Sequence, residues 1–384
     1  MTRGRPMGRR APARYSDSHS EDSLQPMSSP CLEYRAGARR SGRWLLFAVG
    51  WLSTAYFAPR DPGWNVNTRL ALTYAVVEEH RLTIDSFHAT EGYATGDKAV
   101  FEGHVYSDKV IGNALAAVPF YQAGHWIAQA LGAELTPAGK RQICTVPTVG
   151  LSFGLLLVVL AGLFERQGAS PREADLLAAL GGLGTMLFPY ATILMPYVPG
   201  CLLTLLADRL VLPPLGEDAS WTAARQRGIQ ATLDPNVALA RSGPTALAGL
   251  CAGAAMLFDF LFGLVGVALA LHVLWVHRGG QVGRGLALVA LFGAAAVVGV
   301  APQIVYSLAV FGSPTLPYTH EFIPFFRESM AGGFMGIHFP PRPSILWLVT
   351  FHPVRGLYDQ SPLLHMAQPG LLALMQLPDG RARA

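Results

Sequence analysis

The sequence has 384 residues, of which 51% are hydrophobic and only 14% are charged, and its net charge is +4. A soluble protein normally carries about 25% charged residues, so the composition argues against an ordinary soluble domain and indicates a membrane as the main solvent. The positive charge is concentrated in residues 1–43, which hold nine Arg and four Asp or Glu. Because an apolar segment follows at once, the positive-inside rule explains this tail better than binding to nucleic acid does.

The N-terminal third of the chain predicts a tail, one membrane span and a long outer loop. Residues 1–42 are rich in Arg, Ser, Pro and Gly without periodicity, which predicts a disordered basic cytoplasmic tail. Residues 44–57 form the first expected span, which runs outward from that tail. Residues 59–111 are mostly polar, so we expect them to be the first extracytoplasmic loop. Within it, residues 67–82 have apolar side chains at helical spacing and suit a helix on the membrane surface.

Apolar runs dominate the rest of the chain. Residues 114–131 either cross the bilayer or lie in its surface, and clearer spans follow at 143–164, 174–191 and 197–212. Residues 244–276 are too many for one span of about 20. A helical hairpin with Asp259 at its outer tip satisfies this length, and one long tilted helix is the alternative. The chain ends with a span at 285–310, a second outer loop at 311–342, apolar pieces at 344–351 and 362–376, and a polar tail at 377–384.

These runs predict an all-α polytopic membrane protein with about eight transmembrane helices. Its membrane domain is expected to cover residues 43–376, in the cytoplasmic membrane and with the N-terminus on the cytoplasmic side. The four cysteines form no CxxC pair and lie mostly in apolar runs, so they predict neither disulfides nor a zinc site.

A short β-hairpin is predicted in the first outer loop. The segment GDKAVFEGHVYSDKV contains two strand-like triplets, AVF and HVY, on either side of Glu102-Gly103, which can form a two-residue turn. In this register Phe101 faces His104, Ala99 faces Tyr106 and Asp97 faces Asp108.

The hairpin register brings two carboxylates together. Asp97 and Asp108 would lie about 5 Å apart across the ladder, where their repulsion needs a counter-charge. Lys98, Lys109, a metal ion or a cationic substrate could supply it. The structural alternative is that the acids cap the strand ends and the lysines solvate a surface loop. In a chain so poor in charge, this cluster is also a candidate functional site.

Several other polar residues have both a functional and a structural interpretation. Asp85 is a further acid of the loop or an Asx turn, and Asp61 is a candidate acid or a turn residue in Arg-Asp-Pro-Gly. Asp259 is an ionisable residue in a membrane run, which marks a functional candidate, or a polar cap. The late outer loop with His320 and Glu321 suits a lid over an apolar ligand or a connector packed on the membrane. Arg355 is a candidate cation or an interfacial anchor.

Three segments together resemble the GT-C superfamily of integral-membrane glycosyltransferases. They are NVNTRLALTYAVVEE, TGDKAVFEGHVYSDKVIG and FHPVRGLYDQSPLL, and the resemblance covers about residues 43–370. It implies a sugar donor linked to a polyprenyl phosphate, with transfer to a lipid, glycan or protein acceptor on the extracytoplasmic face. The chain departs from the family in two places. Val110-Ile111-Gly112 follows Asp108-Lys109 where the family usually has a Pro-containing turn, and no second acid follows Asp61.

The resemblance also implies roles for residues of the loops. A first-loop carboxylate acts as the base on the acceptor hydroxyl, or positions that hydroxyl or a metal ion; by position the candidates are Asp61, Asp85, Asp97 and Asp108. Cations hold the departing lipid phosphate, and those available are Lys98, Lys109, Arg69 and Arg355. Further residues expected to face substrate are His104, Tyr106, Asp259, His320 and Glu321. No cofactor is implied, and a divalent metal ion stays open.

Two other functions are compatible with this pattern. A transporter or flippase for a lipid-linked substrate would show a repeat between the halves of the chain and ionisable residues near the middle of the membrane. No such repeat is found, and Asp259 is the only clear intramembrane acid. A membrane protein without catalytic activity would make the loop acids replaceable.

Overall fold

The computed structural model describes residues 30–57, 59, 62–211, 235–276, 282–332, 340 and 342–376. The chain divides into two units, Met1–Arg40 and Ser41–Ala384. The described residues are mostly helical, as predicted, with one two-stranded hairpin in the first loop. Residues 1–29 of the predicted N-terminal tail and the predicted polar C-terminal tail, 377–384, lie outside the described residues.

Helix α1 (Pro30–Tyr56) begins well before the span expected from Trp44. The structure has a helix from Pro30, where the sequence predicts a disordered tail up to residue 42. Pro30 suits the first turn of a helix, where its missing N–H costs no hydrogen bond. The Leu, Glu, Ala and Arg residues that follow have high helix propensity, so the polar segment continues into the apolar one as a single helix.

The first loop contains more regular structure than a surface helix and a hairpin. It comprises α2 (Trp64–Tyr74), the π-helical turn η1 (Ala75–Glu79), the strands β1 (Ala99–Phe101) and β2 (His104–Tyr106), and leads into α3 (Gly112–Ala130). Residues 66–74 of α2 are all buried. The expected helix at 67–82 thus exists as far as Glu79, but protein surrounds residues 66–74 on every face, polar residues included.

Two helices of the described residues are long and apolar enough to cross a membrane, judged by length and composition alone. One runs through α4 (Pro137–Thr145), η2 (Val146–Gly150) and α5 (Leu151–Arg166), and the other is α12 (Val282–Phe311). The remaining helices are α6 (Pro171–Leu183), α7 (Leu187–Ala191), α8 (Tyr197–Val211), α10 (Pro235–Met256), α11 (Phe262–Val276), α13 (Pro324–Ala331), α14 (Pro343–Phe351), α15 (Leu357–Gln360) and α16 (Ala367–Gln376), with 3-10 turns η3 (Pro317–His320) and η4 (Pro362–Met366).

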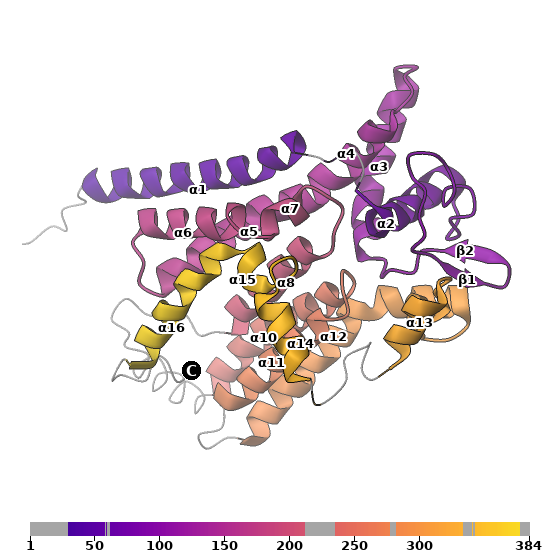
Figure 1. The fold of residues 1–384 in the computed structure, drawn as a ribbon. Helices are drawn as coiled ribbons and strands as arrows, with labels where there is room; N and C mark the ends of the chain where they lie inside the picture. Colours follow the sequence, from indigo (N-terminus) through magenta and orange to yellow (C-terminus); the bar gives the residue numbers. More distant parts are fainter. Residues whose placement is uncertain are drawn as a thin grey trace, which may run out of the picture. The chain divides into compact units, whose positions relative to one another are not determined.

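Helices α10, α11 and α12 pack together, as Figure 1 shows. The break between α10 and α11 contains Asp259, so residues 244–276 form a hairpin rather than one long helix. Glycines bring α10 and α12 into close contact. A Cβ atom added to Gly249 would lie 2.1 Å from the carbonyl oxygen of Phe292, and one added to Gly253 would lie 1.9 Å from that of Ala296. Gly249 and Gly253 form a GxxxG pattern, which lets membrane helices approach backbone to backbone.

The late outer segment packs against the hairpin of the first loop. Ala99 of β1 forms an antiparallel bridge with Glu321, and the N–H of Phe322 donates to the carbonyl oxygen of Lys98 at 2.8 Å. The ring of His320 packs against those of Phe101 and Phe311, with centroid distances of 4.9 and 4.6 Å. This packing places the late segment over the charged end of the hairpin.

Candidate functional site

The hairpin has the predicted register. Ala99 pairs with Tyr106 and Phe101 pairs with His104. Glu102 and Gly103, at φ 50° and 83°, both adopt the left-handed conformation that a type I′ turn requires. Since alternation and turn length set the register of a hairpin, residues just beyond the strands, Asp97 and Asp108, are carried to the same end of the ladder.

Lys109 joins these two carboxylates. Its ammonium nitrogen lies 3.1 Å from Oδ2 of Asp97 and also bonds Oδ2 of Asp108. Lys109 therefore supplies the counter-charge that the pair of carboxylates needs. Burial disfavours its charge, but Asp108 and Asp97 outweigh that effect and raise the pKa of Lys109 above its ordinary value. The side chain of Asp108 is only 1% exposed, whereas those of Asp97 and Lys109 reach the surface.

A second cation, Arg69 of α2, lies near enough to this pair to interact with the charges of both acids. It is buried, and one guanidinium nitrogen bonds the carbonyl and side-chain oxygens of Asn65. Burial lowers the pKa of Arg69, and the charges of Asp108, Asp259 and Asp97 oppose this shift. Its Nε is buried without a hydrogen-bond partner among the described residues. A buried donor without a hydrogen-bond partner costs free energy.

Glu321 completes the cluster from the late outer segment. It is buried, and its carboxyl group lies close to that of Asp108. Burial first, and then the neighbouring Asp108 carboxyl group, raise the pKa of Glu321 to about 8. Two carboxyl groups this close favour a state in which one of them holds a proton. We call Arg69, Asp97, Asp108, Lys109 and Glu321 the ion cluster.

The ion cluster predicts that stability depends on pH. Because the pKa of Glu321 is about 8 in the folded protein against an ordinary value of 4.5, the folded state binds more protons between these two values. We expect the melting temperature of the detergent-purified protein to fall as the pH rises from 5 to 9. The Glu321→Gln variant, which mimics the protonated group, should lose most of this dependence. An unchanged slope in the variant would show that Glu321 is not the titrating group.

The other predicted acids lie elsewhere or have capping roles. Asp85 is exposed and bonds the backbone N–H of Val105 at 2.7 Å and the ring of His104 at 2.8 Å. Partial burial raises its pKa, but these bonds outweigh that effect and hold the pKa of Asp85 below its ordinary value. Asp259 caps its turn through the N–H of Leu261 at 2.9 Å. Asp61 lies outside the described residues.

The remaining predicted residues fill packing and surface positions. Tyr106 is buried in the apolar cluster below the hairpin, and His320 is stacked on Phe311 there. The ammonium group of Lys98 lies over the ring of Phe322, 4.9 Å from its centroid, and 3.4 Å from Nδ1 of His88. Arg355 is exposed in the turn between α14 and α15, where its N–H donates to His352.

A half-buried ionic contact that the sequence did not predict ties η1 to the helices after it. Lys140 of α4 lies 2.7 Å from Oε1 of Glu78, and the same oxygen accepts from the hydroxyl of Tyr121. The ammonium group also lies over the rings of Tyr74 and Tyr121. These partners are too far apart in the chain for any spacing rule to connect them. In the sequence Glu78 is an acidic residue after an apolar run, a pattern common at helix ends, so it gives no sign of an ionic partner.

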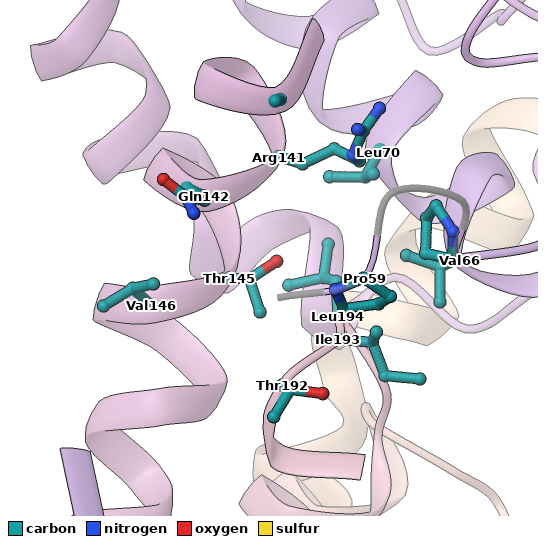
Figure 2. Close-up of a pocket in the computed structure, with 12 residues that line it drawn as sticks. Pro59, Val66, Leu70, Arg141, Gln142, Thr145, Val146, Thr192, Ile193 and Leu194 are labelled. Carbon is teal, nitrogen blue, oxygen red and sulfur yellow. The ribbon is translucent and has the colours of Figure 1, made fainter. Parts of the chain in front are cut away.

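Two hollows open beside α2. The first is lined by residues of α2, α4 and the segment before α8, and it includes Leu70, Arg141, Thr145 and Leu194, as Figure 2 shows. The second lies at the start of α2 and is lined by Gly63, Trp64, Asn67, Gly92, Ala94, Pro137 and Arg141. We call this second hollow the Trp64 pocket. Arg141 borders both.

The described residues contain no group of three or more His, Cys, Asp or Glu side chains arranged to hold a metal ion. Lys109 lies between Asp97 and Asp108, where a shared cation would bind, and so the acids of the ion cluster do not form such a group. Comparison of the chain with models of protein families, with curated proteins and with solved structures found no match.

Proposed function

We propose that this protein is a multi-pass membrane glycosyltransferase of the GT-C type, which moves a sugar from a polyprenyl-phosphate donor to a hydroxyl group of a lipid, glycan or protein. The observation that carries the proposal is the ion cluster. It gathers three carboxyl groups and two cations, from segments far apart in the chain, in a protein with only 14% charged residues.

The chemistry of such a transfer needs a base and a cationic site. Asp108 would accept the proton of the acceptor hydroxyl, whose oxygen then forms a bond to the anomeric carbon with inversion. The bond from that carbon to the phosphate oxygen breaks, and its electron pair leaves with the polyprenyl phosphate. Lys109 and Arg69 would stabilise the negative charge on this leaving group.

The burial pattern suggests how substrates would enter. Lys109 and Asp97 form the accessible edge of the ion cluster, while Asp108 lies below it and contacts Glu321. The late outer segment that carries Glu321 would move aside to expose Asp108, as loops over active sites do. While the segment is closed, Glu321 covers Asp108.

The membrane arrangement belongs to the same proposal. About eight spans would place the first loop and the late segment on the extracytoplasmic side of the cytoplasmic membrane, with the N-terminus inside. Many large apolar side chains of α11 and α12 are exposed, among them Leu264, Val267, Leu271, Val297 and Val305, which suits contact with lipid. The prenyl chain of the donor would lie along such a surface.

A transfer assay tests this function. Membranes containing the protein are incubated with a radiolabelled polyprenyl-phosphate sugar, and both the release of polyprenyl phosphate and the labelled product are measured. We expect transfer by the natural protein and none by the Asp97→Asn/Asp108→Asn variant. Asp85→Asn is the matched control, since Asp85 is exposed and bonded to His104, and it should remain active.

Two results would contradict the proposal. Undiminished transfer by the double variant would remove Asp97 and Asp108 from the mechanism. Movement of the intact donor across the bilayer, without cleavage of its sugar, would instead identify a transporter of lipid-linked sugars.

A further inference from the structure

The Trp64 pocket has three walls, and hydrogen bonds hold two of them together. The start of α2 forms one wall, Gly92 and Ala94 form another, and Pro137 and Arg141 of α4 form the third. Two hydrogen bonds hold the first two walls together. The hydroxyl of Thr95 donates to the carbonyl oxygen of Trp64 at 3.0 Å, and the amide of Asn67 donates to that of Ala94 at 3.0 Å.

Three different binding groups line this pocket. Trp64 is 54% exposed, and Gly96 packs so closely on its ring that an added Cβ atom would lie 2.6 Å from it. Asn67 is only 5% exposed, yet its Oδ1 atom has no hydrogen-bond partner among the described residues. Arg141 forms no ion pair within the described part of the chain.

Each group requires something different from a ligand. A fixed, half-exposed indole offers a flat apolar surface for C–H groups. A buried amide oxygen without a donor requires an O–H or N–H group. The guanidinium group of Arg141 recognises a carboxylate or a phosphate. A simple anion would leave Trp64 and Asn67 unused, and an apolar molecule would leave Asn67 and Arg141 unsatisfied.

A sugar with an acidic group meets all three requirements. The C–H face of its ring stacks on Trp64, one hydroxyl donates to Asn67, and its acidic group pairs with Arg141. The pocket measures about 1170 Å³ with its open side included, which is ample for a monosaccharide. We propose that the Trp64 pocket binds a sugar that carries a carboxylate or a phosphate, a binding activity that does not depend on the transfer reaction.

Saturation-transfer NMR on the full chain in detergent micelles tests this proposal with three probes: glucuronic acid, glucose 6-phosphate and glucose. We expect at least one acidic probe to bind about tenfold or more tightly than glucose. Its ring C–H protons should receive the strongest transfer. Comparison of the two acidic probes tells which group, carboxylate or phosphate, Arg141 recognises.

Variants assign the binding to the pocket. Arg141→Gln should remove the preference for acidic probes, and Trp64→Ala should abolish detectable binding of all three. Trp64→Phe, which keeps an aromatic ring against Gly96, should retain part of it. The matched controls are Trp126→Ala on α3, where Trp126 is 64% exposed, and Arg172→Gln on α6. Both should bind like the natural protein.

The outcomes separate this proposal from the proposed function. Asp97→Asn/Asp108→Asn should bind the acidic probe normally, because the ion cluster takes no part in the pocket. Equal binding of glucose and both acidic probes by the natural protein, or unchanged binding by the Arg141→Gln and Trp64→Ala variants, would overturn the proposal. Binding without any sugar transfer would leave it intact and contradict only the glycosyltransferase.

Discussion

Replacing Lys109 with Met is expected to lower the free energy of unfolding by about 3–5 kcal/mol, the usual cost of removing one partner from a buried ion pair. Lys109 bonds Asp108, whose side chain is 1% exposed, and lies 3.1 Å from Asp97. Without the ammonium group, the charges of Asp97 and Asp108 would repel one another where little water screens them. Chemical denaturation in mixed micelles, followed by circular dichroism, measures the loss.

Lys98 provides the matched control for this prediction. It occupies the corresponding place in the other Asp-Lys pair, but its ammonium group lies over the ring of Phe322 instead of between acids. Lys98→Met should therefore have a small effect. The Lys109→Met/Asp97→Asn variant should recover part of the stability, because it removes one of the repelling charges. Equal stability of the Lys98 and Lys109 variants would show that the ion cluster does not depend on Lys109.

The Gly253→Leu variant is expected to lose at least about 3 kcal/mol of stability, at the upper end of the range for overpacked cores. A Cβ atom at this position would already lie 1.9 Å from the carbonyl oxygen of Ala296, and backbone atoms cannot rotate away as a flexible side chain can. Helices α10 and α12 would have to separate along their whole contact. Thermal unfolding in detergent should show a much lower transition temperature and a smaller yield of monodisperse protein.

The control for this variant is Gly293→Leu on α12. An added Cβ atom there has no atom within 4 Å, so the larger side chain points into open space. Both variants add the same apolar group to a helix glycine, and only Gly253→Leu should destabilise the protein. Similar melting temperatures for the two would mean that α10 and α12 do not pack through Gly253.

Local patterns explain the parts of the structure that the sequence predicted. The hairpin register follows from two three-residue strands and a two-residue turn, and these features lie within about ten residues. Glu102 was a weak turn residue, yet it adopts the left-handed conformation beside Gly103. The break at Asp259 could be predicted because a run of 33 nearly uncharged residues exceeds one bilayer thickness.

The positions of the other members of the ion cluster depend on tertiary contacts and could not be predicted from local sequence patterns. Arg69 was assigned to a surface helix because the apolar spacing of α2 resembles that of an amphipathic helix, whereas the hydrophobic core around it comes from distant segments. Glu321 reaches Asp108 through a bridge to Ala99 that no local pattern encodes. Asp85 was grouped with the other acids by proximity in sequence, but its bonds to Val105 and His104 hold it on the exposed side of the hairpin.

The bridge between Ala99 and Glu321 also sets an order of events during synthesis. Glu321 lies about 200 residues after Asp108 in the chain, and a ribosome adds about 5–20 residues per second, so it follows Asp108 by about 10–40 s. Throughout that interval the edge of β1 has no partner from the late segment, and Asp108 lacks its contact with Glu321. A chaperone or insertion factor that recognises an open strand edge therefore has a defined time in which to act on the nascent chain.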